Sequence, residues 1–473
     1  MTTTTTSVVT QERAAGDHAH LLVRHIAAGA GIPKPPRPNA RRDACPLQLW
    51  ASSGIATLTG HRSSPPTLPR YDFAGRLDGL LRVVEAFAGH CGAALMLDRR
   101  LFTERAAVLG LRRRGHISPN GSARLIDTVD GWLVANLVRD DDRDAVSAWL
   151  GCDVEAAVWP ALGQAARHRS AADLAETGQE LGIPAAVVGD RTGGGGRTRS
   201  ASGVAWPRLT RISSGGERGL SMPKRVPLVV DLSALWAGPL CGHLLTQAGA
   251  RVVKVESTRR PDGARFGPRA FYDLMHAGQE AVAFDFSTAE GRALLARLIA
   301  AADIVVEGSR PRALEQLGIN VDDALKANPA LVWVSLTAYG RHGSSGDRVG
   351  FGDDTAAAGG LVARDRLGVP VFVGDAIADP IAGLVAAAGA FAAWAVGGGV
   401  LVDVALSGAA AFIADAEPIA DADDAEIVGA EGSWRIRSGG AEWPLQRPAT
   451  RPAATGSASV LGADNAAVLS ALT

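Results

Sequence analysis

Short apolar runs alternate with longer helical stretches throughout the second half of the chain. Valine-rich runs typical of buried strands occupy residues 225–232, 250–257 and 303–309, and a fourth lies within 328–340. Residues 287–303 place apolar side chains at helical spacing between two of these runs. Strands that alternate with helices predict βαβ units, and therefore an α/β fold with an open, parallel, Rossmann-like sheet.

Local signals give two helix starts in this half. The first strand is followed by a helical stretch that runs to about Gln247. The helix of residues 287–303 opens with Ser287 and, three positions later, Glu290, the spacing of a capping box.

The first half is less regular and predicts a smaller α+β domain. Residues 76–89 have the pattern of a helix, and residues 122–140 contain a strand or hairpin. Residues 170–188 indicate a helix that ends at a glycine and is followed by a strand.

A run of twenty residues without charge, 381–400, is long enough to cross a membrane. It contains eight alanines and five glycines, whereas the leucine, isoleucine and phenylalanine that favour insertion are scarce. We therefore expect a closely packed core helix and no membrane contact.

Two carboxylates, Asp375 and Asp379, precede this run. Pro380 suits the first position of a helix, which would place Asp379 at the N-cap, where free N–H groups and the helix dipole favour an ionised carboxylate. Asp375 is expected to be a loop residue. On local pattern alone, Asp379 is either a plain cap or a catalytic acid.

Composition narrows the class of protein. The 473 residues are 47% hydrophobic and 21% charged, with 48 basic and 49 acidic side chains and a net charge of −1. This balance gives no field that favours nucleic acid or an anionic membrane. The N-terminus lacks the pattern of a secretory signal, and the four cysteines are far apart, so we expect a cytoplasmic protein without disulfides or zinc.

Common catalytic patterns are absent from the sequence. It contains no GxSxG elbow, HExxH, Walker A motif or GxGxxG after a strand. His243, His276 and His342 have no neighbours at metal-ligand spacing, and we expect no bound metal. His243, in a helical stretch, is interpreted as structural.

Several blocks in order resemble the family III CoA-transferases, the CaiB/BaiF group. The segment 229–257 is similar to the family's opening, with Asp231, then Ala237–Pro239, and then Lys254–Glu256 at a strand end. Residues 284–319 and 328–343 are similar to the next two blocks, and DAIADPIAGL resembles the segment with the family's catalytic aspartate, which matches Asp379.

The resemblance implies an acyl-CoA:carboxylate CoA-transferase in which Asp379 forms mixed anhydrides and an aspartyl-CoA thioester. Its partners would be an acyl-CoA and a carboxylic acid acceptor, with coenzyme A as the carried group. The loop residues Ala237, Gly238 and Pro239 would bind this substrate. Trp236 either lines the pocket or is a packed core aromatic. The candidates for the CoA phosphates are Arg259, Arg260, Arg310 and Arg348.

Departures from the family pattern keep two alternatives open. Gln279 and Glu280 stand where the family commonly has basic residues, which would weaken phosphate binding and fits a non-catalytic CoA-binding descendant. An isomerase or racemase of a CoA thioester is the other alternative, but Phe351 occupies about the position of the His that the racemase branch uses. Asp353 and Asp354 are interpreted as solvated loop residues rather than acids.

The order of the blocks indicates a fused, partly degenerate duplication. Residues 74–89 align without gaps on 378–393, which sets Gly75 opposite Asp379 and predicts one acidic site rather than two. Because 45–188 resembles the family's small domain, we expect this chain to supply both faces of the site, as a pseudo-dimeric monomer or a homodimer.

These patterns divide the chain into five expected segments. They are a disordered tail (1–44), a small-domain portion (45–188), a linker (189–222) whose Gly193–Gly196 run is a weak phosphate-loop pattern, a CoA-binding large domain (223–413) and a C-terminal return segment (414–473).

Overall fold

The computed structural model describes most of the chain. The described residues are 19–38, 45–154, 157–189, 207–211, 226–420, 422–452 and 456–471. The Gly193–Gly196 run lies outside them.

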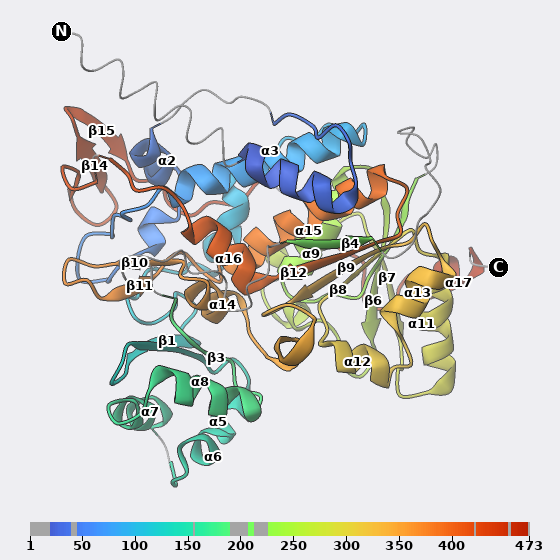
Figure 1. Ribbon diagram of the computed structural model, residues 1–473, viewed down its shortest axis with the longest axis horizontal. Coiled ribbons are helices and arrows are strands. Elements are labelled where there is room, and N and C mark those ends of the chain that lie inside the picture. Colours follow the sequence, from blue (N-terminus) through green and yellow to red (C-terminus); the bar gives the residue numbers. More distant parts are fainter. Residues whose placement is uncertain are drawn as a thin grey trace.

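A seven-stranded sheet forms the centre of the molecule (Figure 1). All its pairs are parallel except β4 with β12, which is antiparallel. In spatial order the strands are β4 (Arg208–Arg211), β12 (Val400–Ala405), β9 (Val332–Thr337), β8 (Ile304–Glu307), β5 (Leu228–Asp231), β6 (Arg251–Ser257) and β7 (Glu280–Phe284). The expected sheet is therefore present but mostly, rather than wholly, parallel. The sequence reading missed β4, β7 and β12.

Both faces of this sheet are buried, because helices cover each side (Figure 1). Successive side chains of β5 point to opposite faces: Val229 joins the core shared with α9, α15 and α3, and Val230 joins the core shared with α11 and α13. The helices on the first face are α3 (Phe73–His90), α9 (Ala237–Gln247) and α15 (Ala378–Ala395), and those on the second are α11 (Ala289–Ala301), α12 (Pro311–Gln316) and α13 (Val321–Ala327).

The strand order reverses at the centre of the sheet. From β5 the chain continues outward through β6 and β7, then returns to place β8 on the other side of β5. In doubly wound sheets, ligands bind outside the carboxyl ends of the strands at such a switch point. The loop after β5 and the residues after β8 therefore mark the expected binding region.

The first half of the chain does not form one separate domain, as the expected 45–188 portion assumed. The helices α2 (Pro46–Ser52) and α3 pack into the main core, because their buried side chains contact α15 and neighbouring elements. A smaller α+β layer holds only the later part, at the bottom of Figure 1. It consists of β1 (Ala123–Asp127), β2 (Trp132–Asn136), β3 (Ala185–Val187), α5 (Asp140–Asp144), α6 (Val146–Leu150), α7 (Val158–Ala166) and α8 (Ala171–Glu180).

Two segments expected to lack structure contain regular elements. Residues 19–30, within the expected tail, form a helix with Leu22, Val23 and Ile26 buried in the main core. Residues 208–211, within the expected linker, form β4. The helix and the strand pack closely against each other, because a Cβ on Gly29 would stand 2.9 Å from Leu209 Cβ.

The C-terminal return segment packs back on the sheet. Helix α17 (Asn465–Ser470) lies against β7, where Asn465 both accepts from Ala283 N–H and donates to its carbonyl. The remaining elements are η1 (Ala56–Leu58), η2 (Arg99–Phe102), α4 (Glu104–Leu109), η3 (Gly263–Phe266), α10 (Arg269–His276), η4 (Gly343–Asp347), α14 (Gly352–Ala358), β10 (Val362–Arg364), β11 (Pro370–Phe372), α16 (Leu406–Ala414), β13 (Glu426–Val428), β14 (Arg435–Ser438) and β15 (Ala441–Pro444).

The long apolar helix is a core element. Within the described residues, α15 is long and apolar enough to cross a membrane, and 89% of that stretch is buried inside the protein. It packs against α9, α3, α16, β9 and β12, which accounts for its alanine and glycine content, since small side chains allow close approach.

Two expected helix starts were wrong by one or two residues. The N-cap of α15 is Ile377, so Asp379 is the second helical residue rather than the cap. The N-cap of α11 is Thr288, whose hydroxyl accepts from Gly291 N–H, whereas Ser287 donates to Asp285.

Candidate active site

Asp379 lies in the first turn of α15, close to the loop that begins α14. A Cβ on Gly352 would stand 2.5 Å from Asp379 Oδ2 and would also overlap the carbonyl oxygen of Ala376. Only a residue without a side chain permits this approach. The glycine therefore brings the α14 backbone against the carboxylate.

The two loops that flank this region hold strained backbone. Leu235, in the loop after β5, has φ 71°, and Ala376, three residues before Asp379, has φ 43°. They are the only described non-glycine residues with positive φ. Side chains rarely adopt this conformation, and such strain concentrates at functional sites.

Asp375 lies in the loop before α15, as expected, but it is not solvated. Its side chain is fully buried, and its Oδ2 accepts a hydrogen bond of 2.6 Å from Nη1 of Arg105 on α4. Its Oδ1 has no hydrogen-bond partner. Arg105, from the first half of the chain, thus binds a carboxylate that lies four positions before Asp379 in the sequence.

Asp353 and Asp354 also lie in the site rather than in a solvated loop, because they open the buried helix α14. Asp353 Oδ1 accepts from the N–H of Ala376, and its Oδ2 accepts from Asn120 Nδ2 at 2.7 Å. Asp354 Oδ1 accepts from Asn136 Nδ2 at 2.7 Å and from the N–H of Phe351. Both asparagines come from the first half of the chain.

Burial controls the ionisation of this cluster. It raises the pKa of Asp379 to about 8, against the lowering effect of Arg105, and the neighbouring carboxylates add to the rise. Burial likewise raises the pKa of Asp375 and of Asp354 to about 7. Desolvation thus outweighs the favourable helix terminus, and the pKa of Asp379 lies above that expected of a helix cap.

The loop after β5 leads into α9, and the start of α9 contacts α15 at Gly383, one helical turn after Asp379. A Cβ on Gly383 of α15 would stand 2.5 Å from the carbonyl oxygen of Ala237. Helix α9 begins there without a side-chain cap, so the N–H groups of Ala237 and Gly238 are not capped by Trp236. Such a helix start favours negative charge.

Of the two roles that the sequence left open for Trp236, its packing fits that of a core aromatic. The residue is 2% exposed, and its ring packs edge-on against Phe271. The Arg105 guanidinium carbon also lies 5.9 Å from its ring centre, which links it to the acidic cluster. Its Nε1 is buried without a hydrogen-bond partner.

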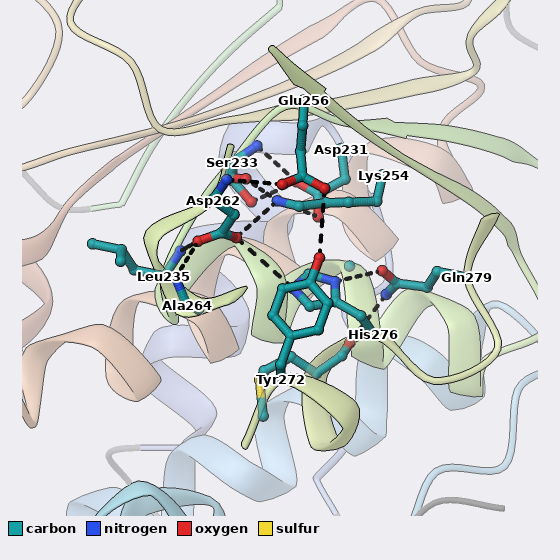
Figure 2. A network of polar contacts seen from close by, with 12 residues as sticks. Asp231, Ser233, Leu235, Lys254, Glu256, Asp262, Ala264, Tyr272, His276 and Gln279 are labelled. Atoms are coloured by element: carbon teal, nitrogen blue, oxygen red, sulfur yellow. Dashed lines mark hydrogen bonds and ion pairs between the residues drawn. The ribbon is translucent and has the colours of Figure 1, made fainter. Parts of the chain in front are cut away.

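A buried polar network holds this loop in place (Figure 2). Lys254 Nζ lies 3.2 Å from Asp262 Oδ2 and 4.0 Å from Asp231 Oδ2, and it donates to the carbonyl of Ser233. Asp262 Oδ1 accepts from the N–H of Leu235, the strained residue. The lysine charge keeps the pKa of Asp262 low despite burial, so the network fixes the loop as an ion pair.

The network continues toward α10 (Figure 2). Glu256 accepts hydrogen bonds from two nitrogens of the Arg265 guanidinium group. His276 Nδ1 lies 2.8 Å from Gln279 Oε1, within hydrogen-bond distance. Burial lowers the pKa of His276 to about 3, so its ring is neutral. Gln279, the residue that departs from the family pattern, is a buried partner in this network.

The four arginines proposed for CoA phosphates separate into three places. Arg259 is exposed and pairs with Asp285, and Arg348 pairs with Glu176 of α8. Arg310 follows β8 at the switch point, and burial lowers its pKa. Other nearby guanidinium groups act in the same direction: Arg312, Arg139 and Arg260. The charge of Arg260 is thus one of those that act on Arg310, whereas Arg348 contacts the smaller α+β layer through Glu176.

Sequence reasoning missed Arg105, Asn120 and Asn136. Each lies in a segment without a catalytic motif, and the first half offered only a general resemblance to a small domain. Among the described residues, no group of three or more His, Cys, Asp or Glu side chains is placed to hold a metal ion.

Comparison with known proteins identifies the region that contains Asp379. Residues 227–438 match the model of CoA-transferase family III. The region that contains Asp379 is therefore similar to CoA-transferase family III. The resemblance based on the sequence blocks is therefore confirmed.

Curated relatives match the same part of the chain. Succinyl-CoA–D-citramalate CoA-transferase of Chloroflexus aurantiacus is 34% identical over 176 residues, 35% of this chain and 43% of that protein. Succinate–glutarate CoA-transferase of Agrobacterium fabrum is 30% identical over 183 residues, 34% of this chain and 46% of that protein. The chain thus spans less than half the length of these relatives.

A solved structure is also similar in part. The crystal structure of a CaiB/BaiF family protein from Brucella suis is 25% identical, with a TM-score of 0.40, and the match covers 46% of this chain and 66% of that one.

Proposed function

We propose that this chain is an acyl-CoA:carboxylate CoA-transferase that uses Asp379 as a covalent nucleophile. The observation that carries the proposal is accessibility within the family III region. Asp353, Asp354 and Asp375 are buried residues, whereas Asp379 as a whole residue is only partly buried. Of the four clustered carboxylates, we therefore propose Asp379 as the one that the thioester reaches.

In the first half-reaction, the ionised Asp379 carboxylate attacks the thioester carbonyl of the donor acyl-CoA. The C–S bond breaks, and a mixed anhydride and CoA thiolate form. The thiolate then attacks the Asp379 carbonyl of the anhydride. This releases the donor acid and leaves an aspartyl-CoA thioester.

The second half-reaction reverses these steps with a new acid. The acceptor carboxylate attacks the aspartyl thioester and expels CoA thiolate, which gives a second anhydride. The thiolate attacks the acceptor carbonyl, forms the product acyl-CoA and returns Asp379 as a carboxylate. Coenzyme A is thus carried between two acids without a metal or redox step.

Backbone and arginine groups are suited to the negative charges of these steps. The uncapped start of α9, with the N–H groups of Ala237 and Gly238, would stabilise an oxyanion or the thiolate. Arg260 and Arg310, at the carboxyl ends of β6 and β8, are the proposed partners of the CoA phosphates.

The proposal is tested by trapping the covalent species. The protein is incubated with a panel of acyl-CoA thioesters that includes succinyl-CoA, and the Asp379 peptide is analysed by mass spectrometry with and without hydroxylamine. We expect a CoA adduct that hydroxylamine removes. Asp379→Asn should lose the adduct and at least about 10³-fold of transfer activity, because the nucleophile is gone.

The surface variant Asp323→Asn serves as the matched control, since Asp323 is 74% exposed and should retain both adduct and activity. If CoA binds but neither adduct nor exchange occurs with any donor, the chain is a non-catalytic CoA-binding descendant, and the proposal is wrong.

A further inference from the structure

Arg105 occupies a position between the two parts of the site. It comes from α4, in the part of the chain outside the family III match. Its guanidinium group donates to Asp375, and its central carbon lies 5.9 Å from the ring centre of Trp236. The arginine side chain is 23% exposed, whereas that of Asp375 is fully buried. The ion pair is therefore largely shielded from solvent.

The balance of charge around Asp379 makes this guanidinium important. The neighbours that act most strongly on Asp379 are three carboxylates and one cation: Asp353, Asp354, Asp375 and Arg105. Removal of the cation would leave several carboxylates close together in a poorly solvated place, where at most some of them ionise.

Other charged groups on the elements packed against α15 have partners of their own. On α9, His243 bonds Arg451, and on β12, Asp403 accepts from the N–H of Arg341. On α3 and η2, the charged side chains bond to groups on α2, α3, η2 and α16, on the loops beside them, and to the carbonyl of Thr450. These α3 and η2 residues are Arg76, Asp78, Arg82, Glu85, Arg99 and Arg100.

We propose that Arg105 is a positioning residue for Asp379. Held between Trp236 and Asp375, its guanidinium fixes the carboxylate cluster and biases Asp379 toward the ionised form that attacks the thioester. This inference rests on the proposed transferase function for its catalytic meaning. It assigns to the first half of the chain a direct part in preparing the nucleophile.

The electrostatic directions agree with this role. Burial raises the pKa of Asp379, Arg105 lowers it, and Asp375 raises it. A change from Arg105 to an uncharged residue should therefore raise the pKa of Asp379 further. Loss of the Asp375 charge should lower it, both by removing repulsion and by leaving the guanidinium to Asp379.

The test compares Arg105→Met with Asp375→Asn by NMR titration of Asp379. Protein labelled with ¹³C at the aspartate carboxyl carbons is titrated, and the Asp379 signal is assigned by its loss in Asp379→Asn. We expect a midpoint about 1 pH unit or more higher in Arg105→Met and lower in Asp375→Asn, the usual scale for the effect of a nearby charge in a poorly solvated site. Arg105→Lys should restore most of the wild-type midpoint.

Arg112→Met is the matched control, because Arg112 follows α4 but is 64% exposed and pairs with Glu431 at 3.8 Å. It should leave the midpoint unchanged. Equal midpoints in wild type, Arg105→Met and Asp375→Asn, or shifts of the same sign in the two variants, would overturn the inference even if thermal stability falls.

The titration also separates this inference from the proposed function. The midpoint of Asp379 is measured without substrate, so it shifts as predicted even in a chain that forms no adduct. If the chain is a transferase, the ascending limb of kcat/KM against pH should move with the same signs. If the protein transfers CoA but the pH dependence of kcat/KM is the same in wild type and Arg105→Met, the proposed function stands. The proposed role of Arg105 is then wrong.

Discussion

At the scale of single residues, the site depends on how closely backbone approaches the Asp379 carboxylate. Gly352 begins α14 where any Cβ would overlap Ala376 and stand 2.5 Å from Asp379 Oδ2. The carboxylate is thus held between a side-chain cluster and bare backbone. In the proposed mechanism, displacement at this point would change the direction of nucleophilic attack, on which the rate depends steeply.

Gly352→Ala should reduce CoA transfer by about 10²-fold, because the added methyl group displaces the carboxylate or the α14 backbone. We expect a stability cost of about 1–3 kcal/mol, as for overpacking in a core. Transfer assays and denaturant unfolding measure the two effects.

Gly89→Ala is the control for this prediction. Gly89 lies near the end of α3, and nothing stands within 4 Å of its would-be Cβ. It should raise stability by up to about 1 kcal/mol through helix propensity and leave transfer unchanged. Full activity in Gly352→Ala would contradict the placement of Asp379 against α14.

At the scale of elements, α15 and α9 form the base of the site through a glycine contact. The Cβ of a residue at Gly383 would meet the backbone carbonyl of Ala237, where α9 begins. Six residues later, at Gly389, the obstacle is the side chain of Val402 on β12. A side chain can change rotamer, whereas the start of a buried helix moves only with its neighbours.

Gly383→Ala should therefore destabilise the protein more than Gly389→Ala, although both gain helix propensity. We expect a cost of about 1–3 kcal/mol for Gly383→Ala and less for Gly389→Ala, measured by chemical unfolding. Gly383→Ala should also weaken CoA binding by calorimetry, because it moves Ala237. A larger loss of stability in Gly389→Ala than in Gly383→Ala would contradict this prediction. It would show that the start of α9 moves aside more easily than Val402.

At the scale of the whole molecule, three distant segments meet at one buried ion pair. Arg451 of the C-terminal return segment makes bidentate hydrogen bonds of 2.7 and 2.9 Å to Glu104 on α4, and its Nη1 lies 2.9 Å from His243 Nε2 on α9. Burial lowers the pKa of His243 to about 3, so the ring is a neutral acceptor for the arginine. Residue 104, the neighbour of Arg105, is thereby anchored to both other segments.

Arg451→Met should cost about 3–5 kcal/mol, since it leaves the buried Glu104 carboxylate without its partner. Glu104→Gln combined with Arg451→Met should cost less than the sum of the single variants, as expected for contacting groups. Chemical unfolding measures both. Arg437→Met, at a pair whose arginine is 51% exposed, should change stability by less than about 1 kcal/mol. A cost for Arg451→Met as small as that of Arg437→Met would contradict this account.

The sequence alone determined much of the central sheet. The apolar runs at β5, β6, β8 and β9 are local signals, because a strand buried on both faces must be apolar along its length. The composition of α15 is also a local signal, because its Ala and Gly content indicates a packed core helix. Blocks such as Ala237–Pro239 and the segment around Asp379 identified the family, since they are contiguous in the chain.

Only the tertiary structure decided which side chains surround Asp379. Arg105, Asn120 and Asn136 lie more than two hundred residues earlier, in segments whose polar residues have the pattern of an ordinary surface. Asp353 and Asp354 likewise resembled a solvated loop until α14 was seen to be buried. Local periodicity reports which face of an element is apolar, but not which distant charge meets it. The ionisation of Asp379 is set by those distant charges and by burial, and so the fold determined it.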